Sequence, residues 1–99
     1  MQNIFIGVDG GGTKSKVRVE NSAGEVIGQA VGGSANIRLS VEKSWDSINS
    51  ALNEILKAAN IDIQDKNYKF HIGLGLAGCE FKEAVDNFLS YPNFFRLLN

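Results

Sequence analysis

A run of three glycines between an aspartate and a threonine is the sharpest chemical feature of the sequence. It reads Asp9-Gly10-Gly11-Gly12-Thr13-Lys14. Phosphate oxygens need several hydrogen-bond donors close together, and consecutive backbone N–H groups supply them only where no Cβ blocks the approach. Asp9 can face Mg²⁺ or its waters, since this ion is held by few carboxylates together with phosphate oxygens. The run therefore predicts a phosphate-binding turn, with Asp9 as the metal residue and Thr13 as a hydroxyl donor to the terminal phosphate.

Other interpretations of this run stay open. A glycine hairpin in which Asp9 fixes the turn needs no ligand at all. Lys14 can meet a phosphate, but a solvated lysine at the start of a strand explains it at least as well. A P-loop or a dinucleotide-binding turn is excluded, because GxxxxGK[ST] is absent and because both motifs lead into a helix, whereas these glycines lead into a strand.

The segments around the glycine run have the patterns of β-strands. Residues 3–9 are apolar and rich in β-branched side chains, which is typical of a strand buried on both faces. Residues 15–20 alternate between apolar and charged side chains and predict a half-exposed strand. After a turn at 21–24, residues 25–31 predict a third strand. We expect these strands to form an antiparallel meander, with the glycine run at its first turn.

Downstream, the apolar period changes to that of a helix. Apolar residues recur at three- and four-residue steps from position 41 to about position 60, and Ser40 stands at the N-cap position. Residues 69–77 predict a further strand, one face of which carries small residues. A second helix is expected to follow Gly78 and to end at Tyr91-Pro92.

The element order β-β-β-α-β-α, to which residues 94–98 can add a strand, predicts an α/β fold. The sheet is expected to be mixed, because a strand–helix–strand link normally returns parallel and right-handed. A length of 99 residues, with 43% hydrophobic and 21% charged residues, suits one globular domain. We expect the sheet to be incomplete at its C-terminal end if the chain stops at Asn99.

Composition also excludes several classes of partner. The net charge of -1 and the pI near 5.7 give no basic footprint for a nucleic acid, whose binding needs clustered Lys and Arg. The single cysteine, Cys79, cannot form an intrachain disulfide, and no spacing of cysteines and histidines indicates a structural metal. No apolar run is long enough to cross a bilayer, and the N-terminus lacks the features of a signal peptide. We therefore expect a cytoplasmic protein that binds neither nucleic acid nor membrane.

Three motifs together resemble one known family. They are GVDGGGTKSKV at 7–17, GGSAN at 32–36 and GLGLAG at 73–78, and they look like those of the N-acetylglucosamine kinase and BadF-type ATPase group. This group belongs to the superfamily of sugar kinases, actin and heat-shock chaperone ATPases. The resemblance implies a ribonuclease-H-like, actin-like ATPase fold, with ATP and Mg²⁺ as cofactors. It also implies that residues 1–99 form the N-terminal part of the first ATPase domain and that the second domain is absent from this chain.

The resemblance further implies a substrate site beside the phosphate turn. Asn36 maps to the asparagine that contacts the sugar in these kinases, and its amide can both donate to and accept from sugar hydroxyls. Its neighbours Gly33 and Ser34 are expected in the same site, and Gly78 is expected to border the sugar or the phosphate. From the residues alone, Asn36 is equally well a turn residue before the helix N-cap.

By resemblance, the intact protein phosphorylates an amino sugar, N-acetylglucosamine or glucosamine, with ATP. The sugar is then its small-molecule partner, and a homodimer of the intact protein is left open. The general base of such kinases is an aspartate that we expect beyond Asn99. Phosphoryl transfer needs several elements at once, so this chain alone is expected to be inactive.

Two alternatives are kept. The first is a BadF-type ATPase that activates a partner reductase. Such activators carry iron–sulfur cysteines, and the presence of Cys79 alone weakens this alternative. The second is a sugar- or ATP-sensing regulator that has the fold without turnover.

Overall fold

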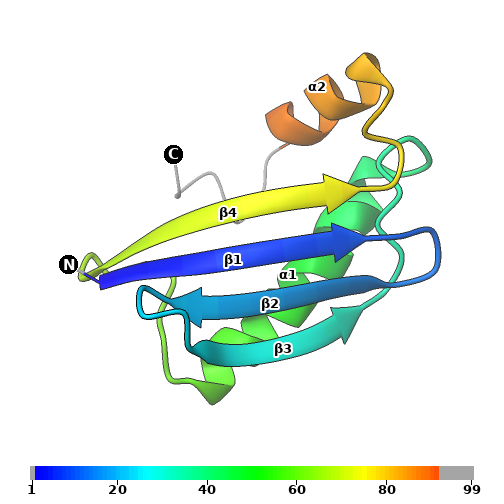
Figure 1. Ribbon diagram of the computed structural model, residues 1–99. Coiled ribbons are helices and arrows are strands. Elements are labelled where there is room, and N and C mark those ends of the chain that lie inside the picture. Colours follow the sequence, from blue (N-terminus) through cyan, green and yellow to red (C-terminus); the bar gives the residue numbers. More distant parts are fainter. Residues whose placement is uncertain (1, 92–99) are drawn as a thin grey trace.

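In the described part of the chain, four strands form one sheet and two helices accompany it (Figure 1). The computed structural model describes residues 2–91. In chain order the elements are β1 (Gln2–Gly10), β2 (Ser15–Asn21), β3 (Val26–Gly32), α1 (Val41–Ala58), β4 (Tyr68–Leu76) and α2 (Lys82–Ser90). The strands lie in the order β3-β2-β1-β4, and β1 is antiparallel to β2 and parallel to β4. The predicted element order and mixed sheet are confirmed, with small shifts at the element ends, and the strand predicted at 94–98 lies outside the described residues.

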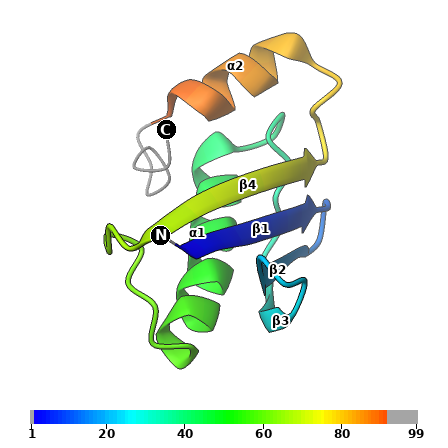
Figure 2. The ribbon, with the colours of Figure 1, turned by 60° about the vertical axis from the view of Figure 1, so that its left-hand side comes forward.

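The hydrophobic core lies between the sheet and α1, which runs along one face of the sheet (Figures 1 and 2). Successive side chains of a strand point to opposite faces, so every second residue of β1 and β2 is buried. These strand residues are Ile4, Ile6, Val8, Val17 and Val19. The buried stripe of α1 consists of Ser44, Trp45, Ile48, Ala51, Leu52, Ile55 and Leu56. This shared core fixes the sheet and the N-terminal end of α1 relative to each other.

The helix α1 begins and ends at recognisable caps. The side chain of Ser40 accepts a hydrogen bond of 3.1 Å from the backbone N–H of Lys43, which confirms the predicted N-cap. At the other end, Asn60 takes a left-handed backbone conformation with φ of 57°. The N–H of Ile61 then donates to the carbonyl of Leu56 at 2.8 Å, as in the common turn that closes a helix.

An aromatic pair joins the helix α2 to α1. The rings of Trp45 and Phe88 stack with centroids 4.1 Å apart and an interplanar angle of 7°. The indole Nε1–H of Trp45 also donates a buried hydrogen bond of 2.9 Å to the carbonyl oxygen of Phe88. Both side chains are almost fully buried, so α2 is held against α1 by apolar contact and by a directional bond.

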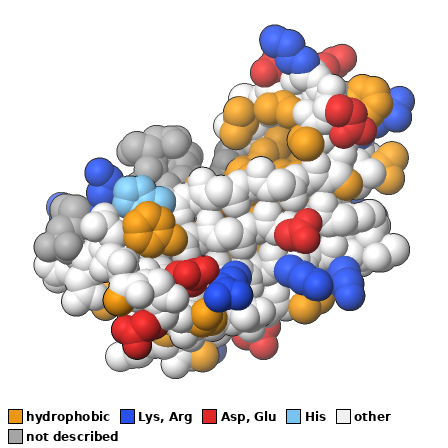
Figure 3. All heavy atoms as spheres, viewed as in Figure 1, with side chains coloured by type: hydrophobic (Ala, Val, Ile, Leu, Met, Phe, Trp, Pro, Cys, Tyr) orange, Lys and Arg blue, Asp and Glu red, His pale blue; other side chains and the backbone are white. Residues whose placement is uncertain are grey.

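The opposite face of the sheet carries no helix within residues 2–91 (Figure 2). Asp9, Lys16 and Arg18 are exposed on this face, and Figure 3 shows that its middle carries few hydrophobic or charged side chains. The prediction that β1 is buried on both faces is therefore wrong for the described residues. Phe5 is 44% exposed, because no described element covers it there. Its ring stacks on His71, with ring centroids 4.9 Å apart. Neither described helix combines the length and the apolarity that a membrane span requires.

Candidate functional site

The glycine turn is joined by backbone hydrogen bonds to the two other glycine-containing motifs. The N–H of Gly11 donates to the carbonyl of Lys14 at 2.8 Å and closes the turn between β1 and β2. The N–H of Ala35 donates to Gly11 O at 2.9 Å, and the N–H of Ala77 donates to Gly10 O at 2.7 Å. Segments far apart in the sequence therefore meet at the end of β1. Because backbone atoms form these bonds, the side chains of the site stay free for other contacts.

A fourth bond joins the two outer motifs directly. The N–H of Ile37 donates to Ala77 O at 3.0 Å, and Asn36 forms a parallel bridge with Ala77. The residues after β3 and after β4 thus lie side by side as a short extension of the sheet. This arrangement places Asn36 next to the turn that leads from β4 to α2.

Gly10 is required by the close packing of these segments. A Cβ on Gly10 would lie 2.6 Å from Leu76 Cδ2 and 2.8 Å from Ala35 Cβ, distances that carbon atoms do not reach without a shift of their surroundings. Gly10 is buried. The lack of a side chain at Gly10 therefore allows the three segments to pack closely. Contact with a ligand is not needed to explain the glycine at this position.

Gly12 has the opposite surroundings. It is exposed, and a Cβ there would meet no atom of residues 2–91 within 4 Å. The tip of the turn is thus open, and a phosphate oxygen can reach its backbone N–H groups from solvent. Thr13 and Lys14 are exposed on the same turn.

A small pocket of about 180 Å³ lies between the glycine turn and the start of α1. It is lined by Gly12, Ser34, Asn36, Leu39, Ser40, Lys43 and Ser44. Three predicted site residues, one from the phosphate turn and two from the predicted substrate segment, therefore share one pocket. Sequence reasoning missed Leu39, Lys43 and Ser44 as lining residues. The N-cap position of Ser40 was a usable signal, because a cap directly after Asn36 brings the first turn of α1 to the same place.

Some polar groups of this pocket already form hydrogen bonds within the protein, and others do not. The hydroxyl of Ser44 donates to Ser40 O at 2.7 Å, while the Ser40 hydroxyl caps α1. Ser34 accepts a bond of 2.7 Å from the Ser47 hydroxyl through its backbone oxygen only. Within residues 2–91, the Ser34 hydroxyl has no protein hydrogen-bond partner.

The side chain of Asn36 is oriented by its own loop. Its Oδ1 accepts a hydrogen bond of 3.1 Å from the N–H of Arg38, and its backbone oxygen accepts from the N–H groups of Leu39 and Ser40, each at 3.1 Å. A backbone N–H can only donate, so the atom that faces Arg38 must be the amide oxygen. The Nδ2 group, which has no partner among the described residues, is left as a hydrogen-bond donor.

Asp9 lies apart from this pocket. It precedes Gly10 on β1, and its exposed side chain is on the open face of the sheet, opposite Lys16 of β2 and Gly75 of β4 in the strand register. It takes part in neither of the two ion pairs found within residues 2–91, so its carboxylate is available to a cation. The described residues contain no group of three potential metal-ligating side chains, and a single carboxylate with phosphate oxygens suits Mg²⁺.

Gly78 and Gly33 were also predicted to belong to the site. Gly78 is buried and has a φ of +90°; it packs behind Asn36 and does not line the pocket. Gly33 is exposed and lies outside the pocket lining as well.

Comparison with known proteins places this geometry in a family. The model of the BadF/BadG/BcrA/BcrD ATPase family matches residues 6–90. A relative, the glucosamine kinase GspK of Vibrio cholerae serotype O1, is 39% identical over 93 residues, which cover 94% of this chain and 31% of the relative. The crystal structure of a Chromobacterium violaceum protein assigned as an N-acetylglucosamine kinase superimposes with a TM-score of 0.79 at 31% identity, over 94% of this chain and 32% of that one.

The chain thus spans about a third of the length of these relatives. The structural likeness confirms the predicted ribonuclease-H-like, actin-like ATPase fold. The match over residues 6–90 includes the glycine turn, Asn36 and Gly78. The chain belongs to the BadF/BadG/BcrA/BcrD ATPase family.

Proposed function

We propose that the full-length protein containing this chain transfers a phosphoryl group from ATP to an amino sugar, glucosamine or N-acetylglucosamine. The observation that carries this proposal is the pocket in which the tip of the glycine turn meets Ser34 and Asn36. Phosphoryl transfer requires the phosphate donor and the acceptor hydroxyl to be held side by side. The names of the two relatives, a glucosamine kinase and an N-acetylglucosamine kinase, support an amino sugar as the acceptor.

The glycine turn is assigned to the phosphates of ATP. In this proposal the backbone N–H groups at the tip of the turn, those of Gly12 and Thr13, donate to phosphate oxygens, while the Gly11 N–H closes the turn by its bond to Lys14 O. Thr13 adds its hydroxyl and Lys14 adds a positive charge. The open space around Gly12 supports this role, because a Cβ there would stand between the backbone and the ligand. Asp9 would hold Mg²⁺, which neutralises phosphate charge when it is bound with ATP.

The segment after β3 is assigned to the sugar. Asn36 would donate through Nδ2 to an oxygen of the sugar, because its Oδ1 already accepts from Arg38. The ammonium group of glucosamine carries only donors, so a hydroxyl or carbonyl oxygen is the expected partner of Nδ2. Ser34, whose hydroxyl has no protein hydrogen-bond partner within residues 2–91, would complete this side of the site.

Residues 1–99 would supply the first phosphate loop and the sugar amide of a larger enzyme. The general base, the second phosphate loop and the adenosine pocket are proposed to come from outside these residues. The share of the relatives' length that this chain covers, about a third, supports this division. On this proposal the isolated chain is inactive.

The description of the matching family as an ATPase family also favours a second candidate, an ATPase without a sugar acceptor. On this alternative a reductase would be its partner. The two candidates differ in where the phosphoryl group goes. The full-length protein is incubated with Mg²⁺-ATP and glucosamine, N-acetylglucosamine, glucose or no sugar, and the products are followed by ³¹P NMR. A sugar-phosphate resonance with an amino sugar supports the kinase, whereas inorganic phosphate that forms equally with and without sugar supports the ATPase and contradicts the kinase.

A further inference from the structure

The strongest packing constraint beside Asn36 comes from Gly78. A Cβ on Gly78 would lie 2.8 Å from Asn36 Oδ1 and 2.8 Å from Arg38 N. These two atoms form the hydrogen bond that orients the Asn36 amide. The φ of +90° at Gly78 is also a conformation that other residues rarely adopt. A side chain at position 78 must therefore displace the atoms that fix Asn36.

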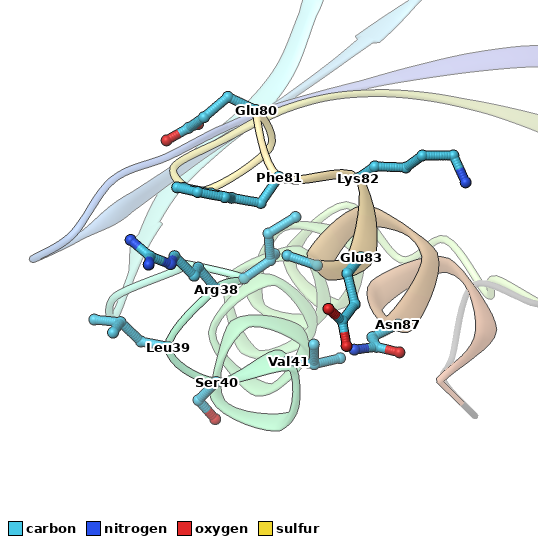
Figure 4. A pocket seen from close by; sticks show the side chains of 11 residues that line it. Arg38, Leu39, Ser40, Val41, Glu80, Phe81, Lys82, Glu83 and Asn87 are labelled. Atoms are coloured by element: carbon cyan, nitrogen blue, oxygen red, sulfur yellow. The ribbon is translucent and has the colours of Figure 1, made fainter.

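The turn that contains Gly78 also contacts Arg38, two residues after Asn36. The guanidinium carbon of Arg38 lies 4.1 Å from the ring centroid of Phe81, and Figure 4 shows the Phe81 ring stacked over the Arg38 side chain. The turn itself is closed by bonds from Cys79 N to Leu76 O at 3.2 Å and from Phe81 N to Gly78 O at 3.1 Å. Arg38 is thus held at its backbone N–H, which donates to Asn36 Oδ1, and at its side chain, which lies over the Phe81 ring.

We propose that the turn at residues 77–81 orients the Asn36 amide, with Gly78 and Phe81 as positioning residues of the sugar site. The three supports act on one segment: Ala77 bonds Ile37, Gly78 packs on the Asn36 and Arg38 atoms, and Phe81 stacks on Arg38. The inference rests on the proposed function in one respect, namely that Asn36 contacts the sugar. Neither positioning residue touches the substrate itself.

The test compares two variants with a matched control in the full-length protein. Gly78→Ala is expected to raise the KM for the amino sugar about tenfold, which corresponds to about 1.4 kcal/mol, while the KM for ATP changes by less than about twofold. Phe81→Leu, which keeps an apolar side chain and loses the cation–π contact, is expected to raise the sugar KM about threefold. Gly73→Ala is the control, because Gly73 is an exposed glycine of β4 whose Cβ would meet none of the described residues within 4 Å. Its KM values should equal those of the wild type.

Two results would overturn the inference. One is an unchanged sugar KM in both variants; the other is a parallel rise of the sugar and ATP KM values, which indicates a general loss of structure. If Gly78→Ala does not fold, Phe81→Leu decides alone by the same criteria.

A second measurement separates this inference from the proposed function. The hydrogen-exchange rate of the Arg38 backbone N–H, which donates to Asn36 Oδ1, is measured without any ligand in the wild type, in Phe81→Leu and in Gly73→Ala. Faster exchange in Phe81→Leu that is absent from the control supports positioning even if the wild type phosphorylates no sugar. Unchanged exchange in Phe81→Leu contradicts positioning even if the wild type is an active kinase.

Discussion

The backbone N–H of Ala77 lies 2.7 Å from the carbonyl oxygen of Gly10 and donates a hydrogen bond to it. This bond ties the end of β4 to the first glycine of the turn. Ala77 in turn accepts from Ile37 at 3.0 Å, so one residue connects the phosphate turn with the segment that carries Asn36. The relative position of the two proposed ligand sites is therefore set by backbone atoms.

The first prediction separates the two functions of the Asn36 side chain. In Asn36→Asp, the carboxylate can still accept from Arg38 N, whereas the Nδ2 donor is lost. We expect the sugar KM to rise about tenfold, since the hydrogen bond from Nδ2 to a sugar oxygen is lost, with little change in thermal stability. Steady-state kinetics and thermal unfolding of the full-length protein measure both.

Asn36→Ala is the matched variant, because it loses both the Nδ2 donor and the hydrogen bond from Arg38 N to the side-chain oxygen. It should lower the free energy of unfolding by about 1 kcal/mol and also raise the sugar KM. An Asn36→Asp variant with a wild-type sugar KM would remove Asn36 from the sugar site.

The second prediction contrasts two glycines of one turn. Gly10→Ala must accommodate a Cβ at 2.6 Å from Leu76 Cδ2, and such overpacking typically costs about 1–3 kcal/mol of stability. The added methyl group of Gly12→Ala meets no atom within 4 Å in the described part of the chain, so this variant should unfold at nearly the wild-type denaturant concentration. We expect Gly12→Ala instead to raise the KM for ATP, because its methyl group stands where a phosphate oxygen must approach.

Chemical denaturation and ATP kinetics on the two variants check this contrast. Equal destabilisation by both substitutions would show that the tip of the turn is packed. A wild-type ATP KM in Gly12→Ala would mean that the phosphates do not approach that tip.

The third prediction concerns the attachment of α2. Trp45→Phe keeps an aromatic ring on Phe88 and removes the buried Nε1–H bond to Phe88 O. Leaving this carbonyl without its partner should destabilise the protein by about 1–3 kcal/mol. Leu89→Ala on the same helix is the control, because Leu89 is 65% exposed and its loss should change the free energy of unfolding by less than about 0.5 kcal/mol. Similar unfolding midpoints for Trp45→Phe and the wild type would contradict this view of the helix contact.

Much of the fold could be predicted because periodicity reports directly on burial. The alternation at 15–20 matches β2, in which Val17 and Val19 are buried, and the helical period from Val41 matches α1 with Ser40 as its cap. The burial of β1 on both faces was wrong, since a run of apolar letters does not reveal whether a second layer is present. The open face at Phe5 is a property of tertiary structure.

The candidate site was only partly accessible from the sequence. The glycine run was recognised, but the sequence does not distinguish Gly10 from Gly12. Gly10 is closely packed, whereas the surroundings of Gly12 are open among the described residues. Ala35 and Ala77 gave no signal at all, because they act through backbone N–H groups that every residue except proline possesses. The assignment of the amide oxygen of Asn36 likewise depends on Arg38 N, a contact that residue types do not encode.

The central claim is that the glycine turn and Asn36 serve one phosphoryl transfer, and a coupled ADP-release assay tests it most directly. The full-length protein is assayed with Mg²⁺-ATP, with and without amino sugar, beside Asp9→Asn, which removes the exposed carboxylate of β1 without altering its buried face. We predict ADP release that depends on the amino sugar in the wild type. We expect it to fall by at least about 100-fold in Asp9→Asn, since the Mg²⁺ that neutralises phosphate charge would lose its protein ligand. ADP release that is indifferent to the sugar, or undiminished in Asp9→Asn, would contradict the account.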